Sequence, residues 1–279
     1  MRFHRVAAGA VGLCAWFFVA SLQAELIIED TFTGYLDNAL ISASPAGSAL
    51  GLTGDWTLTP NSDFFVNKTR SDDNAGTGKA VYDRPAGDNG TRTATRSTSA
   101  NHVLLENDGD VFFASVLLDP ARASGDMTFE LGLTRLDGGG VQNLSFGIIN
   151  GQYIVGNGGV DVKASGGTVT ADEQLVLVRI EYGEADSGPD DSEIVTLWVN
   201  PIDESSTPAI NGILTDVLNR GGVNITSVSM RGDHMGGSPA CFDNLRVGSS
   251  FAAVVPEPST LLLLATALLV LIPMMKRRR

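Results

Sequence analysis

The sequence has two cysteines, three histidines and only 7% aromatic residues among its 279 residues. Cys14 lies in an apolar N-terminal stretch, so Cys241 is alone in the rest of the chain and an internal disulfide there is excluded. His102 and His234 belong to no nucleophile motif such as Gly-x-Ser-x-Gly, which argues against triad chemistry. Cys241 precedes a strand-like apolar stretch, where we expect it to pack as a small buried residue.

Positive charge is also scarce, with 19 Lys and Arg against 32 Asp and Glu and a formal net charge of −13. The first 24 residues carry two arginines. Residues 256–279 carry four basic residues and one glutamate, so the 231 residues between these ends have a formal charge of −18. A body this acidic argues against nucleic acid and anionic lipid as partners. It fits an exported protein that stays dispersed.

The N-terminus has the pattern of a secretory signal peptide. Arg2 and Arg5 form a basic region, Val6–Ala20 is a compact apolar region, and a small residue precedes Glu25. The apolar region is too short for a stable membrane span. We expect residues 1–24 to be a signal peptide, and a retained N-terminal anchor is the alternative.

Three features follow one another at the C-terminus. Pro256-Glu257-Pro258 is held extended, because proline fixes φ and donates no hydrogen bond. The uncharged stretch 260–275 follows, and as a helix it spans about 24 Å, less than the roughly 30 Å hydrocarbon core of a bilayer. We expect one short membrane helix whose end lies in the cytoplasm, because the chain closes on a basic stop: Lys276, Arg277, Arg278 and Arg279.

This order of motif, apolar helix and basic end closely resembles the PEP-CTERM sorting signal, here over 256–279. The resemblance implies recognition of Pro256, Glu257 and Pro258 by an exosortase, a membrane cysteine transpeptidase, and release of the body by cleavage. It implies the secretion translocon and signal peptidase as further partners, and an association with exopolysaccharide. It also implies a location at the envelope surface or outside the cell, after transient anchoring in the membrane. An ordinary C-terminal anchor is the alternative.

The residues between the two ends alternate between short apolar stretches and clusters of Gly, Asp and Asn, which is the all-β pattern. Asn107-Asp108-Gly109 and Asn150-Gly151 predict β-hairpins, and Ile213–Leu218 alone has helical spacing. Turn signals about every 8–12 residues predict an antiparallel two-sheet β-sandwich over 25–250, followed by a linker at 251–255. The expected strands are these: Leu26–Phe32, Trp56–Leu58, Phe64–Val66, Lys79–Tyr82, His102–Glu106, Val111–Leu118, Met127–Leu136, Leu144–Ile149, Gln152–Val155, Leu175–Tyr182, Ile194–Val199, Val223–Met230 and Cys241–Val247.

Four short blocks of this body stand out between variable loops: Gly51–Trp56, Leu175–Tyr182, Thr196–Pro201 and Phe242–Gly248. Together they resemble the laminin-G or concanavalin-like jelly roll. The resemblance implies two stacked antiparallel sheets whose first and last strands pair, which would place Glu25 near Phe251. It implies no single activity, because such folds host binders, hydrolases and spacers alike.

A glycosidase on this fold needs two carboxylates that face one cleft, about 5–9 Å apart, which on one strand means acids at positions i and i+2 or i+4. Glu181 and Glu184 straddle a strand end at the wrong spacing, and a Glu-x-Asp-x-(x)-Glu run is absent. We therefore assign no catalytic residue and expect no enzyme. A polysaccharide-active hydrolase or lyase is the alternative, and it predicts a deep groove with two inward-facing acids.

Calcium is the one cofactor that the sequence leaves open. Hard cations take several oxygen ligands from flexible loops, but no segment has the full EF-hand spacing. The same acids are typical of solubilising turns. The weak candidate ligands are Asp72, Asp73, Asp108, Asp110, Asp190 and Asp191.

Exposed aromatic side chains would mark a carbohydrate-binding face. Trp198 is not among the candidates, because it alternates with Leu197 and Val199 as a core residue does. Arg231-Gly232-Asp233 matches an adhesion tripeptide, but three-residue matches arise easily by chance. We expect an exported, non-catalytic protein that is structural or glycan-associated, with the enzyme as the second reading and a surface adhesin as the third. The aromatic candidates for a binding face are Trp56, Phe64, Phe65, Tyr82 and Tyr153.

Overall fold

The structure is a computed structural model, and the signal peptide and sorting signal expected at the two ends lie outside the part it describes. Among the described residues, no helix is long and apolar enough to cross a bilayer. The described residues are 25–32, 35, 40–43, 49–59, 64–67, 79–82, 91–105, 109–120, 126–135, 141–158, 161–170, 172–182, 192–215, 223–233 and 240–255.

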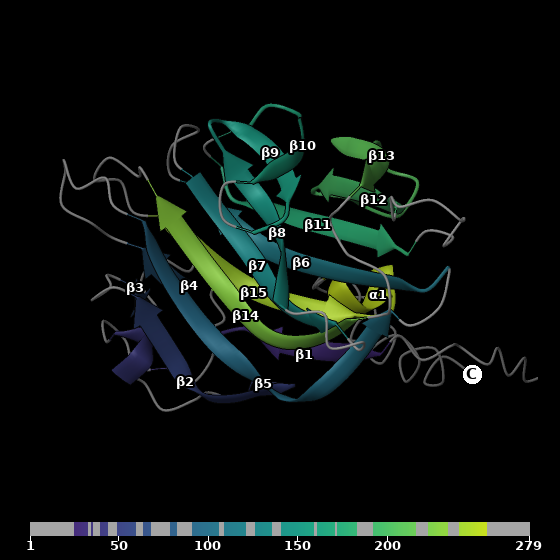
Figure 1. The fold of residues 1–279 in the computed structure, drawn as a ribbon. Coiled ribbons are helices and arrows are strands. Elements are labelled where there is room, and N and C mark those ends of the chain that lie inside the picture. Colours follow the sequence, from purple (N-terminus) through teal and green to yellow (C-terminus); the bar gives the residue numbers. More distant parts are fainter. Residues whose placement is uncertain are drawn as a thin grey trace, which may run out of the picture.

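Two antiparallel sheets make up the fold, as the sequence predicts, and Figure 1 shows them as two layers. The first, called sheet A, has the order β13 (Ile210–Thr215), β12 (Ser192–Val199), β11 (Gln174–Glu181), β6 (Val111–Asp119), β15 (Ala240–Gly248), β4 (Lys79–Tyr82) and β3 (Phe64–Asn67), with β1 (Leu26–Asp30) also paired to β15. The second, sheet B, has the order β10 (Val162–Gly166), β9 (Gln152–Gly156), β8 (Val141–Ile149), β7 (Asp126–Arg135), β14 (Val223–Asp233), β5 (Arg92–Leu105) and β2 (Leu52–Thr59).

The hydrophobic core lies between the two sheets and follows the period-two alternation of the strands. In β7, Phe129, Leu131 and Leu133 point inward and are fully buried, which confirms the alternation predicted there. Sheet A contributes inward residues such as Val176 and Val178 from β11. Side chains at the intervening positions therefore point outward, and these positions are the ones that can form a surface site.

One of the two predicted hairpins is confirmed and the other is wrong. Asn150 and Gly151 join β8 to β9 with φ values of 51° and 73°, the positive values that a tight two-residue turn requires. The hairpin at Asn107-Asp108-Gly109 does not form, because the flanking strands β5 and β6 belong to different sheets. The backbone N–H of Gly109 instead bonds the carbonyl of Tyr182, at the end of β11.

Three elements of the structure differ from the predictions. The helical spacing of Ile213–Leu218 is misleading, since Ile213–Thr215 lie in the edge strand β13. Only the end of the long strand β5 was predicted, because its first half (Arg92–Ala100) is rich in Thr and Ser and lacks apolar runs. Strand β10 was missed for a similar reason, since it is short, lacks an apolar run and is mostly exposed.

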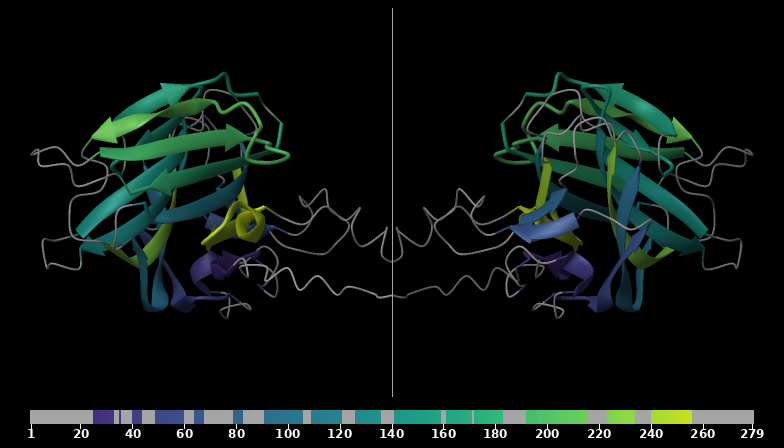
Figure 2. Two further views of the ribbon diagram at one scale, coloured as in Figure 1. Left: turned by 90° about the vertical axis from the view of Figure 1, so that its right-hand side faces the viewer. Right: turned by 90° about the vertical axis from the view of Figure 1, so that its left-hand side faces the viewer.

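The first and last strands of the sandwich pair, as the second resemblance implies. The backbone N–H of Ser249 bonds the carbonyl of Glu25 at 2.9 Å, two residues before Phe251. Beyond this point the chain forms the one-turn helix α1 (Phe251–Val254), which packs on the outer face of sheet A in the segment expected to be a linker. Figure 2 shows α1 in yellow close to the purple N-terminal strand, so the first strand and the last helix of the domain lie side by side.

Candidate functional site

The outer face of β11, β12 and β13 carries two polar rows that the strand register brings together. Arg179 of β11 stands beside Thr196 of β12, which in turn stands beside Asn211 of β13. Glu181 and Ile194 form the next row. Because alternate residues of these strands fill the core, all of these side chains point away from it.

A pocket of about 380 Å³ lies on this face, between the three strands and the loop that joins β12 to β13. Its volume falls within the range of about 300–1,000 Å³ typical of small-molecule sites. The lining combines a guanidinium, a carboxylate, an amide and several hydroxyls with a few apolar side chains: Arg179, Ile194, Thr196, Trp198, Glu204, Ser205, Ser206, Pro208 and Asn211.

The loop wall of the pocket is held by its own hydrogen bonds. Asp203 accepts from both the backbone N–H and the hydroxyl of Ser205, at 2.9 and 2.6 Å. The Ser206 hydroxyl accepts from the N–H groups of Ile202 and Asp203 at 3.1 and 3.3 Å. The hydrogen bonds from the Ser205 hydroxyl and backbone lower the pKa of Asp203 below its ordinary 3.8. The loop is therefore pre-organised while this carboxylate is ionised.

Trp198 connects this loop to the sheet. Its indole N–H donates to the carbonyl of Ser206 at 2.9 Å, and its side chain is only 4% exposed. The residue is thus buried, as expected, but outside the core between the sheets: it packs with Phe113, Leu177 and Val254 on the outer face of sheet A. The rings of Trp198 and Phe251 are nearly perpendicular, with centroids 6.1 Å apart.

The charges at the pocket are partly paired and remain in contact with water. Arg179 forms an ion pair with Glu181, 2.6 Å between Nη2 and Oε2, and the two side chains are 26% and 29% exposed. A guanidinium has five N–H donors, so one ion pair leaves donors available to a ligand. With Glu181 beside the rim and Glu204 in the lining, the formal charge around the pocket is negative. Such a site favours an uncharged ligand rich in hydroxyl groups over an anion.

The lining of this pocket contains a single carboxylate, that of Glu204, whereas glycosidases of the common mechanism use a pair. Asp126 and Glu130 share the outer face of β7, four residues apart along the strand. Asp126 also accepts a hydrogen bond from the backbone N–H of Asn150 at 2.8 Å, so it anchors the β8–β9 turn. Glu181, considered as a catalytic acid from the sequence, is instead the ion-pair partner of Arg179.

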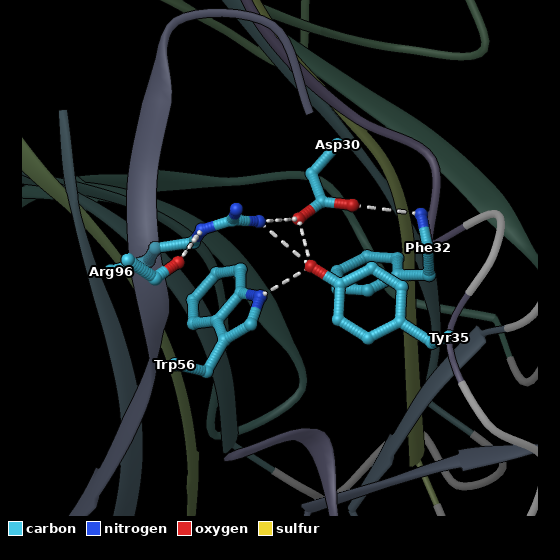
Figure 3. Close-up of polar contacts among 6 residues, drawn as sticks. Asp30, Phe32, Tyr35, Trp56 and Arg96 are labelled. Carbon is cyan, nitrogen blue, oxygen red and sulfur yellow. Dashed lines mark hydrogen bonds and ion pairs between the residues drawn. The ribbon is translucent and has the colours of Figure 1, made fainter. Parts of the chain in front are cut away.

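A second cluster with similar residue types is closed to solvent (Figure 3). Asp30 and Arg96 are each 2% exposed and lie 2.9 Å apart. The Tyr35 hydroxyl lies at the centre: it donates to Asp30 at 2.8 Å and accepts from Arg96 and from the Trp56 indole at 2.8 and 3.1 Å. Arg96 also donates to the carbonyl of Gly54 at 3.0 Å. The cluster joins β1 of sheet A to β2 and β5 of sheet B.

Burial dominates the electrostatics of this cluster. Desolvation raises the pKa of Asp30 above its ordinary 3.8, against the opposing effects of the Phe32 N–H, the Tyr35 hydroxyl and the Arg96 charge. Desolvation also raises the pKa of Tyr35. No ligand can reach a cluster this buried, and its hydrogen bonds run from one protein group to another. Its role is to fasten the N-terminal segment across the sandwich.

The structure brings none of the aromatic candidates to an exposed face among the side chains it describes. Trp56 lies in the buried cluster and is 2% exposed. Tyr153 is equally buried, donates to Gln174, and has its pKa raised by desolvation to about 12. The side chains of the other three candidates lie outside the described residues: Phe64, Phe65 and Tyr82.

The calcium candidates fall mostly in segments outside the description, namely Asp72, Asp73, Asp108, Asp190 and Asp191. Asp110 is described, and its carbonyl accepts from the Tyr182 N–H at 2.9 Å. Within the described ranges, no group of three or more His, Cys, Asp or Glu side chains is placed to hold a metal ion. Cys241, expected to be buried, is 1% exposed.

The polar residues of the pocket were missed in the sequence. The signal was present, because Arg179 and Thr196 occupy outward positions of two strongly apolar strands. A polar residue in such a strand marks the face that is not core. What could not be read was the register, which alone places Arg179, Thr196 and Asn211 in one row.

No family model and no curated protein matches the chain. Among solved structures, the cellulose-induced protein Cip1 is 13% identical with a TM-score of 0.44, over 80% of this chain and 97% of that one. A candidate beta-glucanase from Mycobacterium abscessus is 12% identical with a TM-score of 0.42, over 80% and 100%. Lectin II from Ulex europaeus is 12% identical with a TM-score of 0.39, over 69% and 91%. Likeness at this level says nothing about the ligand or reaction of this chain.

Proposed function

We propose that this chain is an exported, non-catalytic β-sandwich of the laminin-G-like jelly-roll type that binds an uncharged saccharide in the pocket on sheet A. Its ends direct it through the secretion translocon and signal peptidase, and then to an exosortase that reads Pro256-Glu257-Pro258. Its place is the cell envelope surface or the extracellular polymer matrix, and its partner is an exopolysaccharide. Export and sorting rest on the sequence patterns, and binding rests on the pocket.

The lining of the pocket is the observation that carries the binding proposal. Sugar hydroxyls both donate and accept, and the pocket supplies partners of both kinds in Arg179, Asn211 and Glu204. Ile194 and Pro208 provide apolar surface for the C–H face of a sugar ring. The self-bonded loop fixes this geometry before a ligand arrives, which lowers the entropic cost of binding.

The same lining supports binding over hydrolysis. Glycosidases of the common mechanism need an acid and a second carboxylate across the bond that is cut. The pocket lining offers one carboxylate, Glu204, and the nearby Glu181 is paired with Arg179. A polysaccharide-active enzyme is therefore the less favoured reading.

A direct binding measurement tests the proposal. The exported protein, purified from its host, is applied to an array of neutral and acidic oligosaccharides, with and without chelator, and hits are titrated by calorimetry. We expect neutral saccharides to bind. We also expect Arg179→Ala to lose about 10- to 100-fold in affinity, the worth of a hydrogen bond to a charged group.

Lys163→Ala is the matched control, because it also removes one cation from a surface ion pair, but on β10 in the other sheet. Its affinity should equal that of the unaltered protein. Binding that Arg179→Ala and Lys163→Ala weaken equally would contradict the pocket as the site. The absence of any neutral saccharide among the hits would contradict the proposed ligand class.

A further inference from the structure

The segment that leads into Pro256 is packed tightly against the body. Val254 is fully buried, and its carbonyl accepts a hydrogen bond from the Ser115 hydroxyl of β6 at 2.6 Å. The Phe251 ring meets Phe113 and Trp198 edge to face, with centroids 6.4 and 6.1 Å apart. The docked segment is therefore held by contacts to four strands of sheet A, β6, β11, β12 and β15.

The helix is also capped at both of its ends. The Ser250 side chain caps it by accepting from the Ala253 N–H, and the Val255 N–H bonds the carbonyl of Phe251 at 3.1 Å. Gly248 of β15 allows the helix to lie this close, because a Cβ there would stand 2.8 Å from that of Ala253. Only at Val255, with φ −84° and ψ 123°, does the backbone become extended.

This arrangement leaves one extended residue between a docked helix and the Pro-Glu-Pro motif. A peptidase that reads an extended segment acts on free chain, and cleavage next to a folded element proceeds through its locally opened form. Residues 251–254 cannot enter such a cleft while they are helical and packed on sheet A. Access therefore requires the helix to undock, a local opening that is far cheaper than global unfolding.

We propose that Phe251–Val255 is a latch that limits access to the Pro256-Glu257-Pro258 segment, so that processing proceeds through the undocked form. This inference rests on the proposed sorting function for its biological role, while the latch itself rests on the contacts above. When opening and closing are fast, the processing rate follows the population of the undocked form. Weakening the latch then speeds processing without any change in the motif.

The test uses the full-length chain in its host, with pulse-chase labelling and intact mass of the product. Ser115→Ala removes the hydrogen bond to Val254 from a position 139 residues away in the sequence. We expect it, and Val254→Ala, to raise the processing rate about tenfold. The control is Ala252→Ser, on the exposed side of the same helix, which should process at the original rate.

A six-residue Gly/Ser insertion between Val255 and Pro256 provides free chain while the latch stays docked. It should speed processing and remove the added effect of Val254→Ala. Unchanged rates in Ser115→Ala, Val254→Ala and the insertion variant would overturn the latch.

Glu257→Ala separates the two proposals. If it leaves processing unaltered, the sorting function is wrong, and the latch is then judged by hydrogen exchange of the full-length protein in detergent. The Ala253 and Val255 amides should exchange about tenfold faster in Ser115→Ala than in Ala252→Ser, because they are the donors of the closed helix. Equal exchange would overturn the latch independently of sorting.

Discussion

The buried cluster and the pocket contain similar residue types, but their surroundings give them different roles. Each combines an arginine, a carboxylate and a tryptophan: Arg96, Asp30 and Trp56 in the cluster, and Arg179, Glu181 and Trp198 at the pocket. The first ion pair is 2% exposed on both sides, whereas the second is 26% and 29% exposed. Solvent access therefore separates the two regions more than chemistry does.

The difference shows how burial decides whether such residues stabilise the fold or are available to a ligand. In the cluster, Trp56 donates to the Tyr35 hydroxyl, which donates to Asp30, so a ligand would have to break hydrogen bonds within the protein. At the pocket, water still competes for the guanidinium of Arg179, and a ligand has only that water to displace. An arginine in a strand is thus informative only once it is known which side of the sheet its side chain occupies.

The largest expected contrast between the two regions is in stability. Arg96→Met leaves the Asp30 carboxylate buried without its cation, which should lower the free energy of unfolding by about 3–5 kcal/mol. Arg179→Met at the solvent-exposed pair should cost less than about 1 kcal/mol. Urea unfolding followed by circular dichroism measures both, and comparable losses would show that the cluster is not the fastening element described here.

A second contrast concerns buried tyrosines. Tyr35→Phe removes the acceptor of Trp56 and Arg96 together, so we expect a loss of about 1–3 kcal/mol in the free energy of unfolding. Tyr153→Phe is the matched control, since Tyr153 is equally buried and its hydroxyl donates to a neutral group, the Gln174 side chain. The prediction is wrong if the control variant is destabilised as much as Tyr35→Phe.

The smallest expected contrast is in pH dependence, and its sign differs between the two regions. The pKa of Asp30 is raised above 3.8, so its contribution to the free energy of unfolding falls as pH rises from 3.8 through the folded-state pKa. The pKa of Asp203 is lowered, so the loop's contribution is present above pH 3.8 and is lost as pH falls through the folded-state pKa.

Unfolding curves between pH 3 and 6 check these two signs. In the unaltered protein, Asp30 makes the free energy of unfolding fall as pH rises, and Asp30→Asn should remove this dependence. Asp203 makes the free energy of unfolding rise with pH, by a smaller amount and at lower pH, and Asp203→Asn should remove that dependence. Slopes of the same sign at both positions would contradict the contrast between buried cluster and exposed loop.

Much of the fold could be predicted because its signals are local. The alternation of Phe129, Leu131 and Leu133 gave the strand and its buried face, and Asn150-Gly151 gave a turn that only residues tolerant of positive φ adopt readily. The hairpin at 107–109 failed because a turn motif does not say in which sheet the next strand will pair. Strand β5 was mostly missed because its Thr- and Ser-rich half has little apolar pattern to read.

The sequence by itself determined the all-β class, the acidic surface, the burial of Cys241 and the alternating core, since composition and period two need no partner strand. Only the tertiary structure decided that Arg96 is sealed inside while Arg179 lines a pocket, and that the chain docks as α1 just before Pro256. Strand register and sheet assignment bring together residues as distant as Ser115 and Val254, and no local pattern encodes those contacts.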